Sequence, residues 1–174
     1  MIFRNRSISV QKKISLGGIL AGLIIISLMA ASWLPTSRLF FLAASSLFSS
    51  IIIIKVDLAS ALLLYGATAI LAFFIIPSKA IFIAYLLFFG LYGIIKFLCE
   101  QLGSSVMRWI SKITAFNISL LIAYLLAGFV ISSEFSAKLP LPVLWVIAQM
   151  IFIVYDIAYT YFIGFYYEKF DRLI

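Results

Sequence analysis

Six long apolar runs, separated by short polar segments, account for most of the sequence. They cover about residues 14–34, 39–54, 58–76, 80–98, 109–131 and 140–165. Most of them reach the roughly 20 residues that a helix needs to cross about 30 Å of hydrocarbon. Each run is apolar on all sides, whereas a surface helix of a soluble protein has one polar face. The pattern predicts an all-α fold, in which residues 1–174 form a single domain: a polytopic membrane bundle of six transmembrane helices.

The segments between the runs are short, so we expect consecutive helices to be antiparallel neighbours. The segment from Glu100 to Arg108 is the most evident linker, with four helices before it and two after it. Two other connections resemble each other, Pro-Thr-Ser-Arg at residues 35–38 and Pro-Ser-Lys at residues 77–79. In both, a proline ends one helix and a hydroxyl residue can cap the next.

Composition supports the prediction of a membrane protein. The chain is 66% hydrophobic and 11% charged, whereas soluble proteins contain about 25% charged residues. The basic N-terminus followed by an apolar run also resembles a signal peptide. That run has 21 residues, however, and the apolar part of a signal peptide has only about 7–15. We therefore interpret it as the first transmembrane helix.

The basic residues are divided unevenly between the two sets of loops. Ten of the 13 lie on one side of the six-helix pattern, and only Arg38, Lys79 and Lys138 lie on the other. By the positive-inside rule, this predicts a multi-pass protein of the cell (plasma) membrane with both termini in the cytoplasm. The net charge of +7 comes from residues spread along the span ends. We assign it to topology and to anionic lipid headgroups, not to nucleic acid.

The residue types that most enzyme sites need are missing. The sequence has no histidine, which excludes histidine zinc sites and Ser-His-Asp triads. Its single cysteine, Cys99, cannot form an internal disulfide. Only Asp156 is a membrane-embedded aspartate, whereas an aspartyl intramembrane protease needs two, and no nucleotide-binding loop is present. We expect no enzyme, no metal and no cofactor, so active transport would take its energy from a partner or an ion gradient.

Asp156 lies inside the sixth run, where an unpaired carboxylate costs at least about 2.5–3.5 kcal/mol. At a similar depth we expect Lys96, Lys112 and Asn117, which would form a buried polar layer with it. Glu100 follows Lys96 by four residues and could pair with it along one helix face. The layer is either an ion pair that holds three helices together or an ion-coupling site.

Polar residues at helical spacing indicate a second region. Tyr85, Tyr92 and Lys96 share one face of the fourth run. Tyr124 of the fifth run and Gln149 of the sixth run extend this region. These side chains could line a pocket between the last three helices, or they could form hydrogen bonds between packed helices.

Small residues cluster at the predicted cytoplasmic end of the first run. Gly17 and Ala21 form one small-xxx-small pair and Gly18 and Gly22 form another, and such pairs allow two helices to approach closely. The second run also contains many small residues, which we expect to form an internal packing seam: Ala43, Ala44, Ser45, Ser46, Ser49 and Ser50.

Several of these features together resemble the substrate-binding S component of energy-coupling-factor (ECF) vitamin transporters. The resemblance rests on six short helices with both ends inside, the small-residue motif of the first helix, and the Trp-Leu-Pro-Thr-Ser-Arg turn at residues 33–38. The chain also looks like small S-component-like membrane proteins of Gram-positive bacteria, a subgroup of unknown function. There the resemblance includes Tyr-Gly-Ile-Ile-Lys at residues 92–96 and Val-Tyr-Asp at residues 154–156.

The resemblance implies partners and sites. In the family, the motif of the first helix docks on a transmembrane scaffold subunit that works with ATPases, although that motif is usually alanine-based. Its counterparts here would be Gly17, Gly18, Ala21 and Gly22. Family ligands bind in the outer half, which implies four substrate-binding residues: Arg38, Tyr85, Tyr124 and Gln149. No signature of a particular vitamin is present, so the small-molecule ligand stays open.

Three functional hypotheses follow. The first is an S-component-like protein for uptake of a small solute, a vitamin or another metabolite, with a separate energising module. The second is a non-transporting membrane scaffold of the cell envelope or of sporulation, with an S-component-like fold. The third is an ion-coupled transporter that uses Asp156, which would show pH-dependent transport without an ATPase partner.

Overall fold

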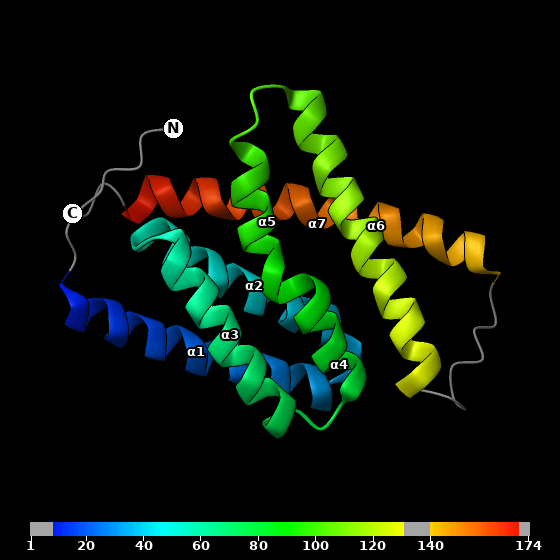
Figure 1. The fold of residues 1–174 in the computed structure, drawn as a ribbon, viewed down its shortest axis with the longest axis horizontal. Helices are drawn as coiled ribbons and strands as arrows, with labels where there is room; N and C mark the ends of the chain where they lie inside the picture. Colours follow the sequence, from blue (N-terminus) through cyan, green and yellow to red (C-terminus); the bar gives the residue numbers. More distant parts are fainter. Residues whose placement is uncertain (1–8, 131–139, 171–174) are drawn as a thin grey trace. The chain divides into compact units, whose positions relative to one another are not determined.

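The computed structural model describes residues 9–130 and 140–170, and these ranges are helical (Figure 1). The elements are α1 (Val10–Trp33), the 3₁₀ turn η1 (Pro35–Ser37), α2 (Arg38–Lys55), α3 (Leu58–Ile75), α4 (Lys79–Ala84), the π-turn η2 (Tyr85–Phe89), α5 (Gly90–Glu100), α6 (Ser105–Val130) and α7 (Leu141–Phe170). Because α4, η2 and α5 form one continuous span, the described residues contain six segments long and apolar enough to cross a membrane. The predicted all-α membrane protein with six spans is confirmed. The cytoplasmic placement of the termini stays a prediction.

The spans begin and end within about five residues of their predicted limits, and most helices run further into the polar segments than predicted. The second span, predicted to be short, gains Arg38 and Lys55 and follows directly on the 3₁₀ turn. The linker predicted from Glu100 to Arg108 shrinks to residues 101–104, because α5 runs to Glu100 and α6 begins at Ser105. Charged and hydroxyl residues end an apolar run, but they do not end a helix.

The two similar connections are capped differently. Before α4, the hydroxyl of Ser78 accepts a hydrogen bond from the amide of Ile81 at 3.5 Å, as the sequence predicts. Before α2, Ser37 makes no side-chain cap, because the chain already winds through the 3₁₀ turn that starts at Pro35. Proline suits this place, since the first helical position needs no amide hydrogen.

The structure consists of two units, one with α1 to α6 and one with α7. In the first unit, α1 lies along α2, and α3 packs on both (Figure 1). The helix α2 also contacts α5, and α5 contacts α6. The fourth span therefore packs against α2 and α3 on its core side and contacts α6 as well.

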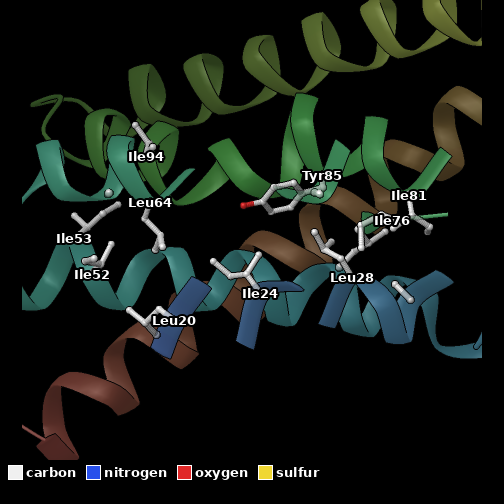
Figure 2. Packing of buried hydrophobic residues seen from close by; sticks show 14 residues of the cluster. Leu20, Ile24, Leu28, Ile52, Ile53, Leu64, Ile76, Ile81, Tyr85 and Ile94 are labelled. Atoms are coloured by element: carbon white, nitrogen blue, oxygen red, sulfur yellow. The ribbon is translucent and has the colours of Figure 1, made fainter. Parts of the chain in front are cut away.

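One face of α1 contributes buried residues to the hydrophobic core of the first unit. Leu20, Ile24, Leu28 and Ala31 recur every three or four residues and are almost fully buried. They belong to one cluster with buried residues of the other helices (Figure 2): Leu42, Ile52, Ile53, Ala61, Leu64, Ala72, Ile76, Ile81, Tyr85 and Ile94. Because lipid tails are as apolar as these side chains, close van der Waals packing holds the cluster together.

The predicted seam of small residues on α2 is internal at its four serines. Ser45, Ser46, Ser49 and Ser50 are all buried. The hydroxyl of Ser45 donates to the carbonyl of Leu42 in its own helix at 2.7 Å. A serine that is satisfied within its own helix can be buried like a small apolar residue, which keeps α2 close to its neighbours.

A charged contact ties the beginning of α1 to the beginning of α3. Asp57 is the N-cap of α3, and its Oδ1 accepts a hydrogen bond from the amide of Ser60 at 2.7 Å. Its Oδ2 lies 3.0 Å from Nζ of Lys13. The hydrogen bonds from Ser60, and after them the one from Lys13, lower the pKa of Asp57 from 3.8 to about 2.

Replacing Asp57 by asparagine should remove a defined part of the pH dependence of stability. The folded-state pKa lies below the ordinary value, so the unfolded state binds the proton more tightly. The contribution of Asp57 to stability is therefore complete above about pH 4 and is lost as the pH falls towards about 2. Thermal unfolding in detergent across this interval should show a smaller loss of stability for Asp57→Asn than for the wild-type protein.

Asp57→Ala is the matched comparison. Asparagine keeps a good N-cap and loses only the ion pair, whereas alanine loses both. The cap is worth about 1 kcal/mol, and a largely exposed ion pair contributes about 0–1 kcal/mol. We expect Asp57→Ala to unfold at a lower temperature than Asp57→Asn at neutral pH. Equal unfolding temperatures for the two variants would contradict the role of Asp57 as a cap.

Candidate functional site

The fourth span is not a regular α-helix. Tyr85–Phe89 wind into a π-turn, in which the amide of Gly90 donates to the carbonyl of Tyr85, five residues earlier. Such turns contain one extra residue and are frequent at functional sites. Inside a membrane no water is available to replace displaced backbone hydrogen bonds, so the carbonyl groups of the turn need donors from the protein.

Two neighbouring helices supply these donors. The hydroxyl of Tyr65, on α3, donates to the carbonyl of Leu86 at 2.8 Å. The hydroxyl of Ser119, on α6, lies 2.9 Å from the carbonyl of Leu87 and 3.0 Å from a carbonyl of its own helix. The π-turn is thus bonded by side chains from two other spans.

Tyr85, the first residue of the π-turn, is completely buried. Its hydroxyl lies 2.6 Å from Oγ1 of Thr68, on α3. Thr68 Oγ1 donates to the carbonyl of Leu64 at 2.7 Å, which leaves its lone pairs to accept from Tyr85. The hydroxyl of Ser49, on α2, interacts with Tyr85 as well. The ring points into the core beside Ile24 and Leu64 (Figure 2).

Gly90 makes room for two tyrosine rings at the end of the π-turn. A Cβ atom at this position would lie 2.8 Å from the ring of Tyr65 and 2.9 Å from the ring of Tyr85. The centroids of these two rings are 6.3 Å apart. Both rings therefore lie against bare backbone. We refer to Tyr65, Thr68, Tyr85, Gly90 and Ser119 as the π-turn cluster.

Gly90→Ala should destabilise the protein, whereas Gly66→Ala should stabilise it. Alanine at position 90 forces two ring contacts below 3.0 Å, and overpacking of this kind costs about 1–3 kcal/mol. A Cβ at Gly66, in the middle of α3, meets no atom of the described residues within 4 Å, and alanine is the better helix former by about 0.5–1 kcal/mol. Thermal unfolding of both variants in detergent measures the difference. If Gly90→Ala unfolds at or above the wild-type temperature, the rings are not held against the backbone.

A second polar group joins the end of α5 to the beginning of α6. Nζ of Lys112 lies 2.6 Å from Oε1 of Glu100, and Nη1 of Arg108 lies 3.2 Å from Oε2. Lys112 and Lys96 are both buried, as the sequence predicts. Lys96, the predicted partner of Glu100, also acts on it through its charge. The direct contacts to Glu100 from Lys112 and Arg108 run between two helices, whereas the sequence suggested a pair along one helix.

Glu100→Gln should therefore loosen α5 from α6. A hydrogen bond between charged groups contributes about 1.5–3 kcal/mol, and the side chain of Lys112 is only 5% exposed. Glu168→Gln is the control, because it also removes one carboxylate, from an exposed position on α7. Thermal unfolding should show a clear loss of stability for Glu100→Gln and almost none for Glu168→Gln. Similar small losses in both variants would mean that the contact to Lys112 is unimportant.

The π-turn also changes the predicted polar face of the fourth span. The prediction that Tyr85, Tyr92 and Lys96 share one face assumed a regular α-helix. The extra residue rotates the following residues by roughly 100°. Tyr85 therefore meets α3, while the ring of Tyr92 packs on Phe88 at 5.0 Å, and Phe88 contacts Phe116 of α6. Nζ of Lys96 lies 6.0 Å from the ring of Tyr92.

The four predicted substrate-binding residues lie in different surroundings. Tyr85 belongs to the π-turn cluster, and its hydroxyl is engaged within the protein. Tyr124, on α6, is 59% exposed, and Arg38, at the start of α2, is also exposed. Gln149 lies on α7 and is half-buried. Binding of one ligand by these four residues stays a prediction.

The small residues of α1 point in two directions. A Cβ atom at Gly17 would lie 3.8 Å from Ile52, so this position faces α2, and Ala21 packs against the core. A Cβ atom at Gly18 or at Gly22 would have no described atom of another part of the chain within 4 Å. One pair of the predicted motif is therefore used inside the unit, and the other faces outwards.

The helix α7 carries the predicted membrane aspartate. Asp156 shares one face of α7 with Phe152 and Tyr159, and all three residues are buried. Asn117, on α6, donates to a backbone carbonyl of its own helix at 2.8 Å. The pairing of Lys96 with Asp156 stays a prediction.

The sequence reasoning missed four members of the π-turn cluster. Tyr65 and Thr68 are hydroxyl residues three positions apart in an apolar run, which places them on one helix face and could have marked them. Ser119 is likewise a hydroxyl residue within an apolar run. Gly90 carries no such signal, because glycine is common in membrane helices.

No protein-family model matches the chain, and neither a curated protein nor a solved structure matches it. Among the described residues, histidine, cysteine, aspartate and glutamate side chains nowhere gather in a group of three that could hold a metal ion.

Proposed function

We propose that the chain is an S-component-like, substrate-binding membrane protein that serves uptake of a small solute with a separate energising module. The outward pair of glycines on α1 carries this proposal. Two glycines four residues apart leave a flat strip on a helix, where the backbone of a partner helix can approach closely. Gly18 and Gly22 form such a strip, and their Cβ positions are open within the described residues.

The resemblance to S components supplies the kind of partner. A transmembrane scaffold subunit would dock on this strip, and ATPases bound to that subunit would supply the energy that the chain cannot draw from a nucleotide site of its own. The solute, a vitamin or another small metabolite, would be bound by Arg38, Tyr85, Tyr124 and Gln149. The protein would lie in the cell membrane with both termini in the cytoplasm, as the distribution of basic residues predicts.

Replacing Gly18 and Gly22 together by leucine should abolish docking without unfolding the protein. Two leucine side chains would hold the partner helix away, and we expect recovery of the ATPases to fall by at least about tenfold. Tagged protein is purified from bacterial membranes in mild detergent, and its partners are identified by mass spectrometry. Gly164→Leu is the control. Gly164 lies on α7, and a Cβ there also meets no atom of the described part of the chain within 4 Å.

The possible results separate the hypotheses. Loss of scaffold and ATPase subunits from the Gly18/Gly22 variant alone, with an unchanged unfolding temperature, supports docking on α1. Equal recovery in both variants would show that docking occurs elsewhere. If the wild-type protein recovers no such module and retains no small molecule, the uptake proposal is wrong. Uptake that depends on pH and persists without any ATPase would instead favour ion coupling through Asp156.

A non-transporting membrane scaffold is the second candidate, and the closed π-turn cluster favours it. A tyrosine that binds a solute needs a hydroxyl that can reach the solute, whereas Tyr85 is completely buried and bonded to Thr68. A scaffold of the cell envelope or of sporulation would recover structural partner proteins in the same purification, without ATPases and without a bound small molecule.

A further inference from the structure

The π-turn accommodates one extra residue between α4 and α5. This residue can be absorbed into a regular α-helix if α5 moves forward by one position. Such a shift advances α5 by about 1.5 Å and rotates it by about 100°. The fourth span therefore has two helical registers, the observed π register and a regular α register.

The groups that hold the π register come from other helices. Tyr65 of α3 bonds the carbonyl of Leu86, and Ser119 of α6 bonds the carbonyl of Leu87. In the α register these carbonyl groups would bond within their own helix. The hydroxyl of Tyr65 would then lose its acceptor, and the hydroxyl of Ser119 would keep only the carbonyl of Ala115 in its own helix. We propose that α5 is a register switch, which Tyr65 and Ser119 hold in the π register.

Tyr65 also blocks the shift sterically. In the α register, Phe89 takes the place that Gly90 holds beside the tyrosine rings. A Cβ atom there would lie 2.8 Å from the ring of Tyr65 and 2.9 Å from the ring of Tyr85, so both rings must give way before α5 can advance. Tyr65 is only half-buried, which gives its side chain space to swing away from the span. A partner or solute that displaces Tyr65 would thus remove the hydrogen bond to Leu86 and one of the two ring contacts that oppose the shift.

The shift would put a different set of α5 residues into the buried places and would replace Lys96 by an apolar residue in one of them. The buried places on α5 hold Tyr92, Lys96 and Cys99, and also Gly90, Gly93 and Ile94. After a shift by one position, the places of Tyr92, Lys96 and Cys99 go to the preceding residues: Leu91, Ile95 and Leu98. In the observed register Leu98 is 49% exposed, and Leu91 and Ile95 are half-buried. Each of these apolar residues directly precedes one of the three buried residues in the sequence. Both registers can therefore bury a face of α5, and in the α register Lys96 leaves its buried place.

Cys99 reports which register is present. It is the single cysteine of the chain and is 7% exposed. In the α register it would move to the place of Glu100, whose side chain is 35% exposed at the helix end. The rate at which a maleimide probe labels Cys99 in the full-length protein therefore measures how often α5 advances.

We expect Tyr65→Phe and Ser119→Ala each to accelerate labelling of Cys99 by about three- to tenfold, the effect of one lost hydrogen bond on the register equilibrium. Tyr65→Ala removes the hydroxyl and the ring together and should accelerate labelling more than Tyr65→Phe. Thermal unfolding of each variant confirms that the protein stays folded. Wild-type labelling rates in folded Tyr65→Ala and Ser119→Ala would overturn the switch.

Deletion of Leu87 is the matched control. It removes the extra residue, so the fourth span becomes a regular helix while Cys99 keeps its buried place. Labelling should then be slow, and Tyr65→Ala should no longer accelerate it. If Tyr65→Ala accelerates labelling equally with and without Leu87, it loosens the protein generally and the register proposal is wrong. Deletion of Leu86 serves the same purpose if the first deletion does not fold.

Discussion

Inside a bilayer, every backbone hydrogen bond has to be made by the protein, and this constraint shapes the fourth span. Regular helices meet the requirement by themselves, so the other spans are free to carry apolar side chains on every side. The π-turn at Tyr85–Phe89 does not meet it alone. It relies on hydroxyl groups from α3 and α6 and on a residue without a side chain at position 90. Three spans therefore depend on one another at this point.

The spans themselves were predictable from the sequence. Apolar runs fix where a helix lies in the bilayer, and their limits differ from the observed helices by only a few residues. The differences concern mainly polar and charged residues at the span ends, such as Lys13, Lys55 and Glu100, which are helical although they are charged. Hydropathy marks the edge of the hydrocarbon, whereas the end of a helix depends on backbone hydrogen bonds. Lys96 and Lys112, predicted from their depth to share one layer with Asp156, are buried, and the layer itself stays a prediction.

The π-turn and its partners were not predictable in the same way. The direction in which a helical residue points is predicted from its number by assuming a constant number of residues per turn. The extra residue of the π-turn changes that direction for every later residue of the fourth span. This is why Tyr85 and Tyr92 were expected on one face, although Tyr85 bonds to Thr68 of α3 and Tyr92 packs on Phe88 of its own span. The partners of Glu100, Arg108 and Lys112, lie on the next helix. The sequence reasoning paired Glu100 with Lys96 because the rule used for it concerns residues four positions apart along a single helix.

The contact between Lys13 and Asp57 bears on how the chain is assembled in the membrane. It joins residues 44 positions apart, near the beginnings of α1 and α3. During synthesis, α1 and the whole of α2 therefore emerge before the carboxylate that Lys13 binds. The first hairpin has to enter the bilayer with this lysine still solvated by water or lipid headgroups. When the third helix arrives, Lys13 exchanges that solvation for the ion pair with Asp57. The contact can therefore stabilise the hairpin of α1 and α2 only after the hairpin has inserted.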